Sequence, residues 1–154
     1  MKIRPGTLAL VVLIIIVAII IISSFAGYRY DTIRSGSMAP EIEAGDLLIS
    51  VPIEPENIEI GDKILYRSQE GVIVCHRVIN IDHASRYIET KGDANPTPDT
   101  DKIPFSSVVG KSIVSIPYLG YVVAFLGSIY GIASVAAVLV TIYLLKEKVL
   151  KDSI

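Results

Sequence analysis

The polarity pattern divides the chain into two long apolar stretches with a mixed segment between them. Positions 5–28 carry no charge, and Leu8–Ile22 is an unbroken run of 15 apolar residues. A second charge-free stretch covers positions 112–145. About 20 helical residues span a bilayer core of about 30 Å. The pattern therefore predicts transmembrane helices at residues 7–27 and 121–145.

The segment between these helices has short apolar stretches separated by turn residues, which is typical of strands. We expect a mainly β domain over residues 28–112, followed by a membrane-surface segment at 113–120, where "IPYLGY" contains a proline and a glycine. The stretches "GDLLISV", "GDKILYR", "GVIVCHRVINI" and "RYIETKG" predict strands at 45–51, 61–67, 71–81 and 86–92. The "ANPTPD" stretch predicts a rigid loop after the last of them.

The distribution of charged residues predicts on which side of the membrane each segment lies. Lys2 and Arg4 precede the first apolar stretch, and three lysines lie at positions 146–151 after the second. By the positive-inside rule, the ends at 1–6 and 146–154 are predicted to be cytoplasmic, and the β domain to lie on the other side of a cell membrane or endoplasmic reticulum membrane. Residues 31–110 hold 14 acidic and 7 basic residues. That balance argues against a nucleic acid partner.

Composition leaves one alternative for the first apolar stretch. Half of the chain is hydrophobic (51%), and the mean hydropathy is +0.56. The basic start, the apolar run and "SFAG" also resemble a secretory signal with cleavage after Ala26. The run is longer than a usual signal core, so we favour a retained helix.

Cys75 is the only cysteine and cannot form an internal disulfide. No metal-ligand spacing or cofactor motif is found, so we predict neither a metal nor a cofactor.

The stretch "SGSM" contains the best candidate for a nucleophile. Gly36 relieves steric limits on the backbone just before Ser37. The hydroxyl of Ser35 could act as an oxyanion donor beside the backbone N–H of Ser37. Taken alone, these residues are more typical of a polar turn after a membrane helix.

A serine nucleophile needs a base, and the middle segment contains two histidines. His76 lies in "VIVCHRVI", where a period of two places it on one strand face with Val74 and Val78. That partly apolar setting favours the neutral, proton-accepting imidazole. A lone strand histidine can also be a hydrogen-bonded core residue. His83 is expected in an exposed turn.

Other bases and nucleophiles are weaker candidates. Lys63, Lys91 and Lys102 would each need burial to lose a proton near neutral pH, and none lies in a clearly apolar stretch. Cys75 is adjacent to His76, but neighbouring strand residues point to opposite faces.

Two aspartates could orient the imidazole of His76. Asp93 lies in "TKGDAN" at a strand exit, and Asp99 ends the "NPTPD" loop. Either could stabilise a charged His76, as the acid of a catalytic triad does. Each is also typical of a capping or turn aspartate. We favour Asp99, because its proline-bounded loop could fold back over the strand that carries His76.

The order of these motifs resembles type I signal peptidases, and more closely the archaeal and endoplasmic reticulum branch, which uses histidine as the base. The resemblance rests on "SGSMAP", "AGDLLIS", "IGDKILYR", "CHRVI" and "TKGDAN" with the aspartate that follows. It implies a small signal-peptidase-like β domain in which Ser37 is the nucleophile, His76 the general base and Ser35 an oxyanion donor. Asp93 and Asp99 match the two acids of the family.

The resemblance implies a membrane-bound serine endopeptidase that removes signal peptides after small residues. Its expected partners are signal-bearing preproteins, the lipid bilayer and the translocon. One alternative is a non-catalytic, membrane-tethered β domain that serves as a binding subunit of a processing complex. Another is a self-cleaving regulator with a serine–lysine pair, which the two apolar stretches and the absence of a DNA-binding motif disfavour.

Overall fold

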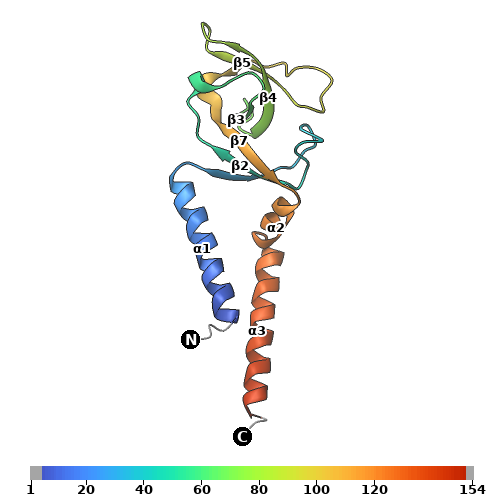
Figure 1. Ribbon diagram of the computed structural model, residues 1–154. Coiled ribbons are helices and arrows are strands. Elements are labelled where there is room, and N and C mark those ends of the chain that lie inside the picture. Colours follow the sequence, from blue (N-terminus) through green and yellow to red (C-terminus); the bar gives the residue numbers. More distant parts are fainter. Residues whose placement is uncertain (1–4, 152–154) are drawn as a thin grey trace.

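The computed structural model describes residues 5–151 of the chain and, for side chains, residues 6–146. It confirms the mainly β fold: seven antiparallel strands form one curled sheet in the order β1-β2-β7-β3-β4-β5-β6 (Figure 1). The strands are β1 (Arg29–Thr32), β2 (Leu47–Val51), β3 (Lys63–Arg67), β4 (Ile73–Asp82), β5 (Tyr87–Lys91), β6 (Ile103–Pro104) and β7 (Val108–Ile116).

The four predicted strands are present as β2 to β5, whereas β1, β6 and β7 were not predicted. The most informative of these is β7, which lies in the middle of the sheet between β2 and β3. It extends four residues beyond the expected domain boundary at 112, so half of the predicted surface segment is strand. A close approach explains the glycine in this strand: a Cβ on Gly110 would lie 2.6 Å from the backbone oxygen of Val51.

Within residues 5–151, three helices accompany the sheet: α1 (Pro5–Phe25), α2 (Leu119–Leu126) and α3 (Ile129–Lys151). The single helix expected at 121–145 is thus divided in two. The division occurs at Gly127 and Ser128, where the Ser128 hydroxyl accepts a hydrogen bond from the N–H of Gly131 (3.1 Å) and donates one to the carbonyl of Phe125 (2.6 Å). Both bonds satisfy backbone groups that a helix end leaves without partners.

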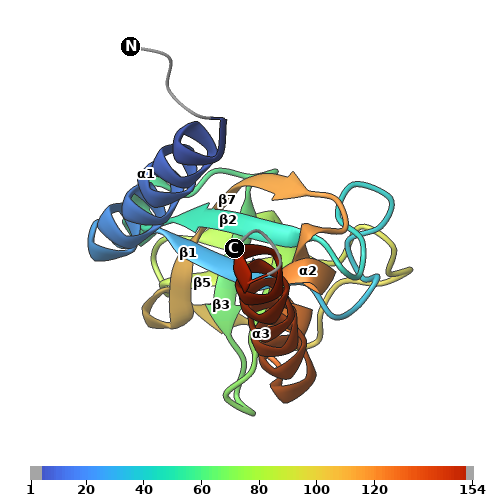
Figure 2. The same cartoon turned by 90° about the horizontal axis from the view of Figure 1, so that it is seen from below.

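Helices α1 and α3 are long and apolar enough to cross a membrane. Their windows Gly6–Phe25 and Ile129–Lys146 have mean hydropathies of 3.3 and 1.9, and almost none of their residues are buried against the rest of the protein. Both helices extend from the same side of the β domain (Figure 1), and they leave it at separate points when seen from below (Figure 2). The predicted ends include residues 1–4 and 152–154, which lie outside the described residues. The topology and the alternative of cleavage after Ala26 stay predictions.

Helix α2 is attached to the turn that precedes β2. The Asp46 carboxylate accepts the N–H of Tyr118 at 3.3 Å and the N–H of Glu43 at 3.0 Å. Gly45 lies so close to Tyr121 that a Cβ there would be 1.9 Å from the ring, and its φ of +96° also favours glycine. The same turn exchanges backbone hydrogen bonds with Ile33, four residues before Ser37. The turn therefore links α2 to the segment that leads to Ser37.

The hydrophobic core has two clusters on opposite faces of the β3–β4 pair. On β3, Ile64 and Tyr66 belong to the first cluster and Leu65 to the second, as the strand period of two requires. The first cluster consists of Ile58, Ile64, Tyr66, Val78, Ile88, Ile103 and Phe105; the second consists of Met38, Ile42, Leu48 and Leu65. Residue 37 is next to Met38 of the second cluster, and residue 76 lies on β4, which contributes side chains to both clusters.

Candidate active site

Ser37 lies at the start of a tight turn whose next residue is anchored in the core. The Met38 side chain is only 2% exposed in the second cluster. The turn is closed by hydrogen bonds from the Ala39 N–H to the Gly36 carbonyl and from the Ile42 N–H to the Met38 carbonyl, both 3.0 Å. Burial of Met38 thus fixes the backbone, while Ser37 remains partly exposed.

The loop after β5 holds the backbone of Ser37 from the other side. The N–H of Ala94 donates to the Ser37 carbonyl at 2.9 Å. A Cβ on Gly92 would lie 2.7 Å from that same oxygen, so only a glycine allows this approach without a shift. The "KGDAN" stretch therefore positions Ser37 directly.

His76 connects Ser37 to Asp99 through its two ring nitrogens. The imidazole is buried on the β4 face that it shares with Val74 and Val78, as the strand alternation predicts. Its Nε2 lies 3.0 Å from Ser37 Oγ, and its Nδ1 lies 2.6 Å from Asp99 Oδ2. An ionised carboxylate only accepts hydrogen bonds, so Nδ1 donates to Asp99 and leaves Nε2 able to accept the Ser37 hydroxyl proton.

Asp93 binds Arg77 instead of His76. Arg77 donates from Nε to Asp93 Oδ1 at 2.8 Å and from Nη2 to Oδ2 at 2.6 Å. These hydrogen bonds hold the pKa of Asp93 below its ordinary value and raise that of Arg77. Arg77 also donates to Glu41 at 2.5 Å, and Lys63 forms an ion pair with the other oxygen of Glu41. Asp93 therefore belongs to an ion cluster that joins the Ser37 turn to β3, β4 and the loop after β5.

Ser35 lies beside Ser37. The two hydroxyl oxygens are 3.4 Å apart, and Ser35 is exposed, so its hydroxyl can turn toward a group bound at Ser37. The predicted oxyanion role of Ser35 is compatible with this position and stays a prediction.

The weaker candidates lie in other environments. Lys102 pairs with Glu89 at 3.3 Å, and within residues 6–146 none of Lys63, Lys91 and Lys102 is hydrogen-bonded to Ser37. His83 is exposed, with its ring edge-on to Phe105. Cys75 faces the second cluster, and burial raises the pKa of its thiol to about 12. Among the described side chains, no His, Cys, Asp and Glu group is arranged to hold a metal ion.

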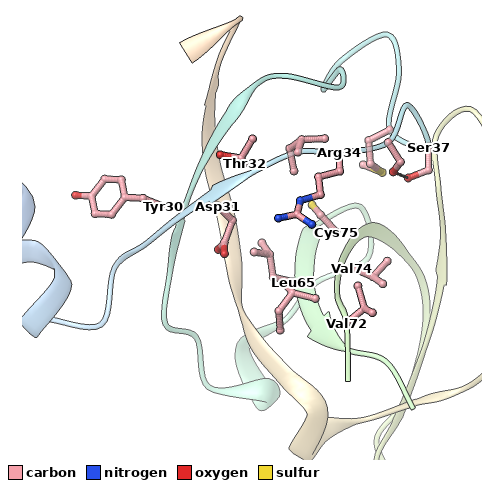
Figure 3. Close-up of a pocket in the computed structure, with 13 residues that line it drawn as sticks. Tyr30, Asp31, Thr32, Arg34, Ser37, Leu65, Val72, Val74 and Cys75 are labelled. Carbon is pink, nitrogen blue, oxygen red and sulfur yellow. Dashed lines mark hydrogen bonds between the residues drawn. The ribbon is translucent and has the colours of Figure 1, made fainter. Parts of the chain in front are cut away.

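A groove of about 590 Å³ opens beside Ser37 (Figure 3). One wall is β1 with the residues up to Ser37, and the other consists of Val72 and the first residues of β4, including Val74. Ile33 and Met38 are among the apolar residues that line it. Strand β1 is an edge strand, and β4 pairs with β5 only from Arg77 onward. In both walls, therefore, the strand backbone is hydrogen-bonded to a neighbouring strand on one side only.

Sequence reasoning missed two residues that contact Asp99. Thr90 Oγ1 donates to Asp99 Oδ2 at 2.7 Å, and the Tyr66 hydroxyl donates to the same oxygen at 3.3 Å. A signal for Thr90 was present: the period of two in "YIETK" places it inward with Ile88, and a polar residue at an inward position calls for a partner. The Tyr66 hydroxyl had no comparable signal.

No family model matches the chain, but individual curated proteins do. Signal peptidase I W of Bacillus subtilis is 28% identical over 107 residues, which is 62% of this chain and 56% of that protein. The signal peptidase complex catalytic subunit SEC11 of Verticillium alfalfae is 30% identical over 104 residues, covering 58% and 59%. The human subunit SEC11C is 29% identical over 101 residues, covering 58% and 53%. The chain thus spans just over half the length of these relatives. Over the segment that it shares with them, the chain is a homologue of the type I signal peptidases.

Proposed function

We propose that the chain is a membrane-bound serine endopeptidase that cleaves N-terminal signal peptides from preproteins. The observation that carries this proposal is the continuous hydrogen-bonded series from Ser37 through His76 to Asp99. The homology to signal peptidases supports the substrate class. The activity, the substrates and the partners of the whole protein remain part of the proposal.

In the proposed reaction, His76 is the general base. Its Nε2 takes the proton of the Ser37 hydroxyl while Oγ forms a bond to the carbonyl carbon of the scissile peptide. Asp99 stabilises the resulting imidazolium through Nδ1. His76 then gives the proton to the departing amine, which breaks the C–N bond and leaves an acyl group on Ser37. Water, deprotonated by His76, releases that acyl group and regenerates the hydroxyl.

The negative charge on the carbonyl oxygen needs hydrogen-bond donors. In the proposal, the Ser35 hydroxyl and the backbone N–H of Ser37 are these donors. The 3.4 Å separation of the Ser35 and Ser37 hydroxyls supports this role, because an attacked carbonyl would lie next to both. Loss of one oxyanion donor typically slows catalysis by about 100- to 1000-fold.

The groove accommodates the substrate as an extended peptide. The strand edges on its two walls offer backbone hydrogen bonds to such a peptide, which is the usual mode of strand addition. The apolar residues next to Ser37, among them Ile33 and Met38, favour small apolar side chains just before the cleaved bond. A Phe in place of a small residue at that position is expected to block cleavage.

We further propose that α1 and α3 cross the bilayer, with both termini cytoplasmic and the domain predicted at 28–112 on the other side of a cell or endoplasmic reticulum membrane. The exit of both helices from one side of the domain supports this arrangement. It would hold Ser37 near the surface where preproteins leave the translocon. Proteases added to sealed right-side-out vesicles should then degrade the β domain, and full protection would contradict this topology.

Purified full-length chain in lipid vesicles provides the test of activity. The wild type should cut a preprotein after its signal, giving a new N-terminus that mass spectrometry identifies. Ser37→Ala should lose this cleavage and remain folded, whereas Ser106→Ala, an exposed serine in the same domain, should retain it. Equal cleavage by wild type and Ser37→Ala would exclude the enzyme proposed here. A wild type that binds the preprotein without cutting it would favour the non-catalytic binding subunit.

A further inference from the structure

One carboxylate oxygen receives three hydrogen bonds in this structure. Asp99 Oδ2 accepts from His76 Nδ1 at 2.6 Å, from Thr90 Oγ1 at 2.7 Å and from the Tyr66 hydroxyl at 3.3 Å. Asp99 itself lies in an irregular loop between β5 and β6. A side chain on such a loop has no regular structure to fix its direction. The two additional donors come from strands and supply that constraint.

Thr90 holds Asp99 through both its backbone and its side chain. The Thr90 carbonyl accepts the Asp99 N–H at 2.9 Å, and the hydroxyl binds the carboxylate. Thr90 is fully buried in β5, on the face of Ile88, opposite Val78 on β4. Valine has the same shape and suits such a site, and burying a hydroxyl costs free energy unless it is hydrogen-bonded. The hydroxyl is therefore explained by its bond to Asp99.

Tyr66 lies on β3, whereas Thr90 lies on β5, and the strand that carries His76 lies between them. Its ring is 5% exposed in the first hydrophobic cluster and meets the His76 ring edge-on, with centroids 6.4 Å apart. Burial raises the pKa of Tyr66 to about 12, so its hydroxyl keeps its proton at any pH suitable for the reaction. Tyr66 is thus a permanent donor, although its bond is longer than that of Thr90.

We propose that Thr90 and Tyr66 are positioning residues that fix the Asp99 carboxylate against Nδ1 of His76, with Thr90 making the larger contribution. Asp99 held in this way keeps the proton on Nδ1 and the lone pair on Nε2, which faces Ser37. The consequence for catalysis rests on the proposed function. The consequence for the imidazole tautomer does not, and it can be measured on the folded protein alone.

Nitrogen NMR of the histidine ring tests the tautomer directly. The sample is full-length chain in detergent micelles, labelled at histidine, in a His83→Gln background that leaves His76 as the only signal. At a pH where the ring is neutral, wild type and Thr90→Ser should show the Nδ1–H tautomer. Thr90→Val should show a mixture of both tautomers, and Thr97→Val, at an exposed loop position, should match wild type. An unchanged spectrum in Thr90→Val would overturn the proposal.

Cleavage kinetics test the catalytic consequence. Loss of a hydrogen bond to a charged group should raise the activation free energy enough to lower kcat by about 10- to 100-fold in Thr90→Val, with KM little changed. Thr90→Ser should recover to within about threefold of wild type. Tyr66→Phe should lose about two- to tenfold, whereas Tyr87→Phe, an exposed tyrosine, should lose nothing. Tyr66→Phe also serves as the second probe if Thr90→Val does not fold.

A double-mutant cycle separates positioning from a general effect on the fold. If Thr90 acts through Asp99, Thr90→Val should cost nothing further in an Asp99→Ala background. Full additivity of the two losses would overturn the proposal. Absence of Ser37-dependent cleavage in wild type, together with the expected tautomer shift, would refute the proposed function and leave the positioning role intact. Ser37-dependent cleavage that Thr90→Val leaves unchanged would refute the positioning role alone.

Discussion

The two ends of the loop that follows β5 each hold an aspartate, and they hold it in different ways. At the start of the loop, Asp93 binds the guanidinium of Arg77 within a cluster of charged side chains. Near its end, Asp99 accepts hydrogen bonds from two hydroxyls and an imidazole, all on the sheet face of the first hydrophobic cluster. The charge of Asp93 is balanced by the guanidinium of Arg77, whereas Thr90 and Tyr66 bring no positive charge to Asp99, whose partner for an ion pair is His76. In our proposal, these environments give Asp93 a structural role and Asp99 the catalytic role.

Replacing each aspartate in turn by asparagine tests the different roles of Asp93 and Asp99. Asp99→Asn should lower kcat by about 10⁴-fold, as loss of the triad acid does in serine proteases, because the amide no longer fixes the reactive tautomer. Asp93→Asn should stay within about tenfold of wild type, since Asp93 has no hydrogen bond to His76. Initial rates of preprotein cleavage give both values. A larger loss in Asp93→Asn than in Asp99→Asn would reverse the assignment.

Gly92 offers a smaller change at the Asp93 end of the loop. Gly92→Ala places a methyl group 2.7 Å from the Ser37 carbonyl oxygen, so the turn must move away from Ser37. We expect a loss of about 10- to 100-fold in kcat, because small displacements of a nucleophile are costly. In Gly6→Ala the added methyl meets nothing within 4 Å, and the rate should not change. An unchanged rate in Gly92→Ala would mean that this contact does not position the nucleophile.

The pH dependence of stability tests the ion pair between Asp93 and Arg77. Its folded-state pKa lies below the ordinary value of 3.8, chiefly because of the Arg77 hydrogen bonds. The ionised form is therefore favoured in the folded state, and its contribution to stability is present above pH 3.8 and lost as the pH falls through the lowered pKa. Urea unfolding should show wild type more stable than Asp93→Asn at pH 6, with the difference shrinking below pH 3.8. A difference that grows on acidification would contradict the ion-pair assignment.

Alternation of polar and apolar residues was sufficient to predict β2 to β5 and the inward face of His76. It did not predict β7, because "VVGKSIVSI" has no regular alternation of polar and apolar residues and lies close to a membrane helix. Nor did it predict the break before α3, which depends on the two hydrogen bonds of the Ser128 hydroxyl.

The candidate site divides in the same way. The motifs were sufficient to select Ser37, His76 and the pair of aspartates. They could not show which aspartate contacts His76, because that depends on how the loop after β5 folds: it brings Asp99 to His76 and Asp93 to Arg77. The Asp99 donors on β3 and β5 depend equally on strand register, which brings distant residues together.

We propose that Ser37 and His76 act as one catalytic unit, and cleavage by a set of single and double variants is the strongest test of this. Ser37→Ala and His76→Ala should each lose several orders of magnitude in kcat, and the double variant should be no slower than either, because residues that act as a unit are not additive. Lys63→Met, Lys91→Met and Lys102→Met should each stay within about tenfold of wild type. Full loss of cleavage in a folded lysine variant, with activity retained in His76→Ala, would show that a lysine and not His76 is the base.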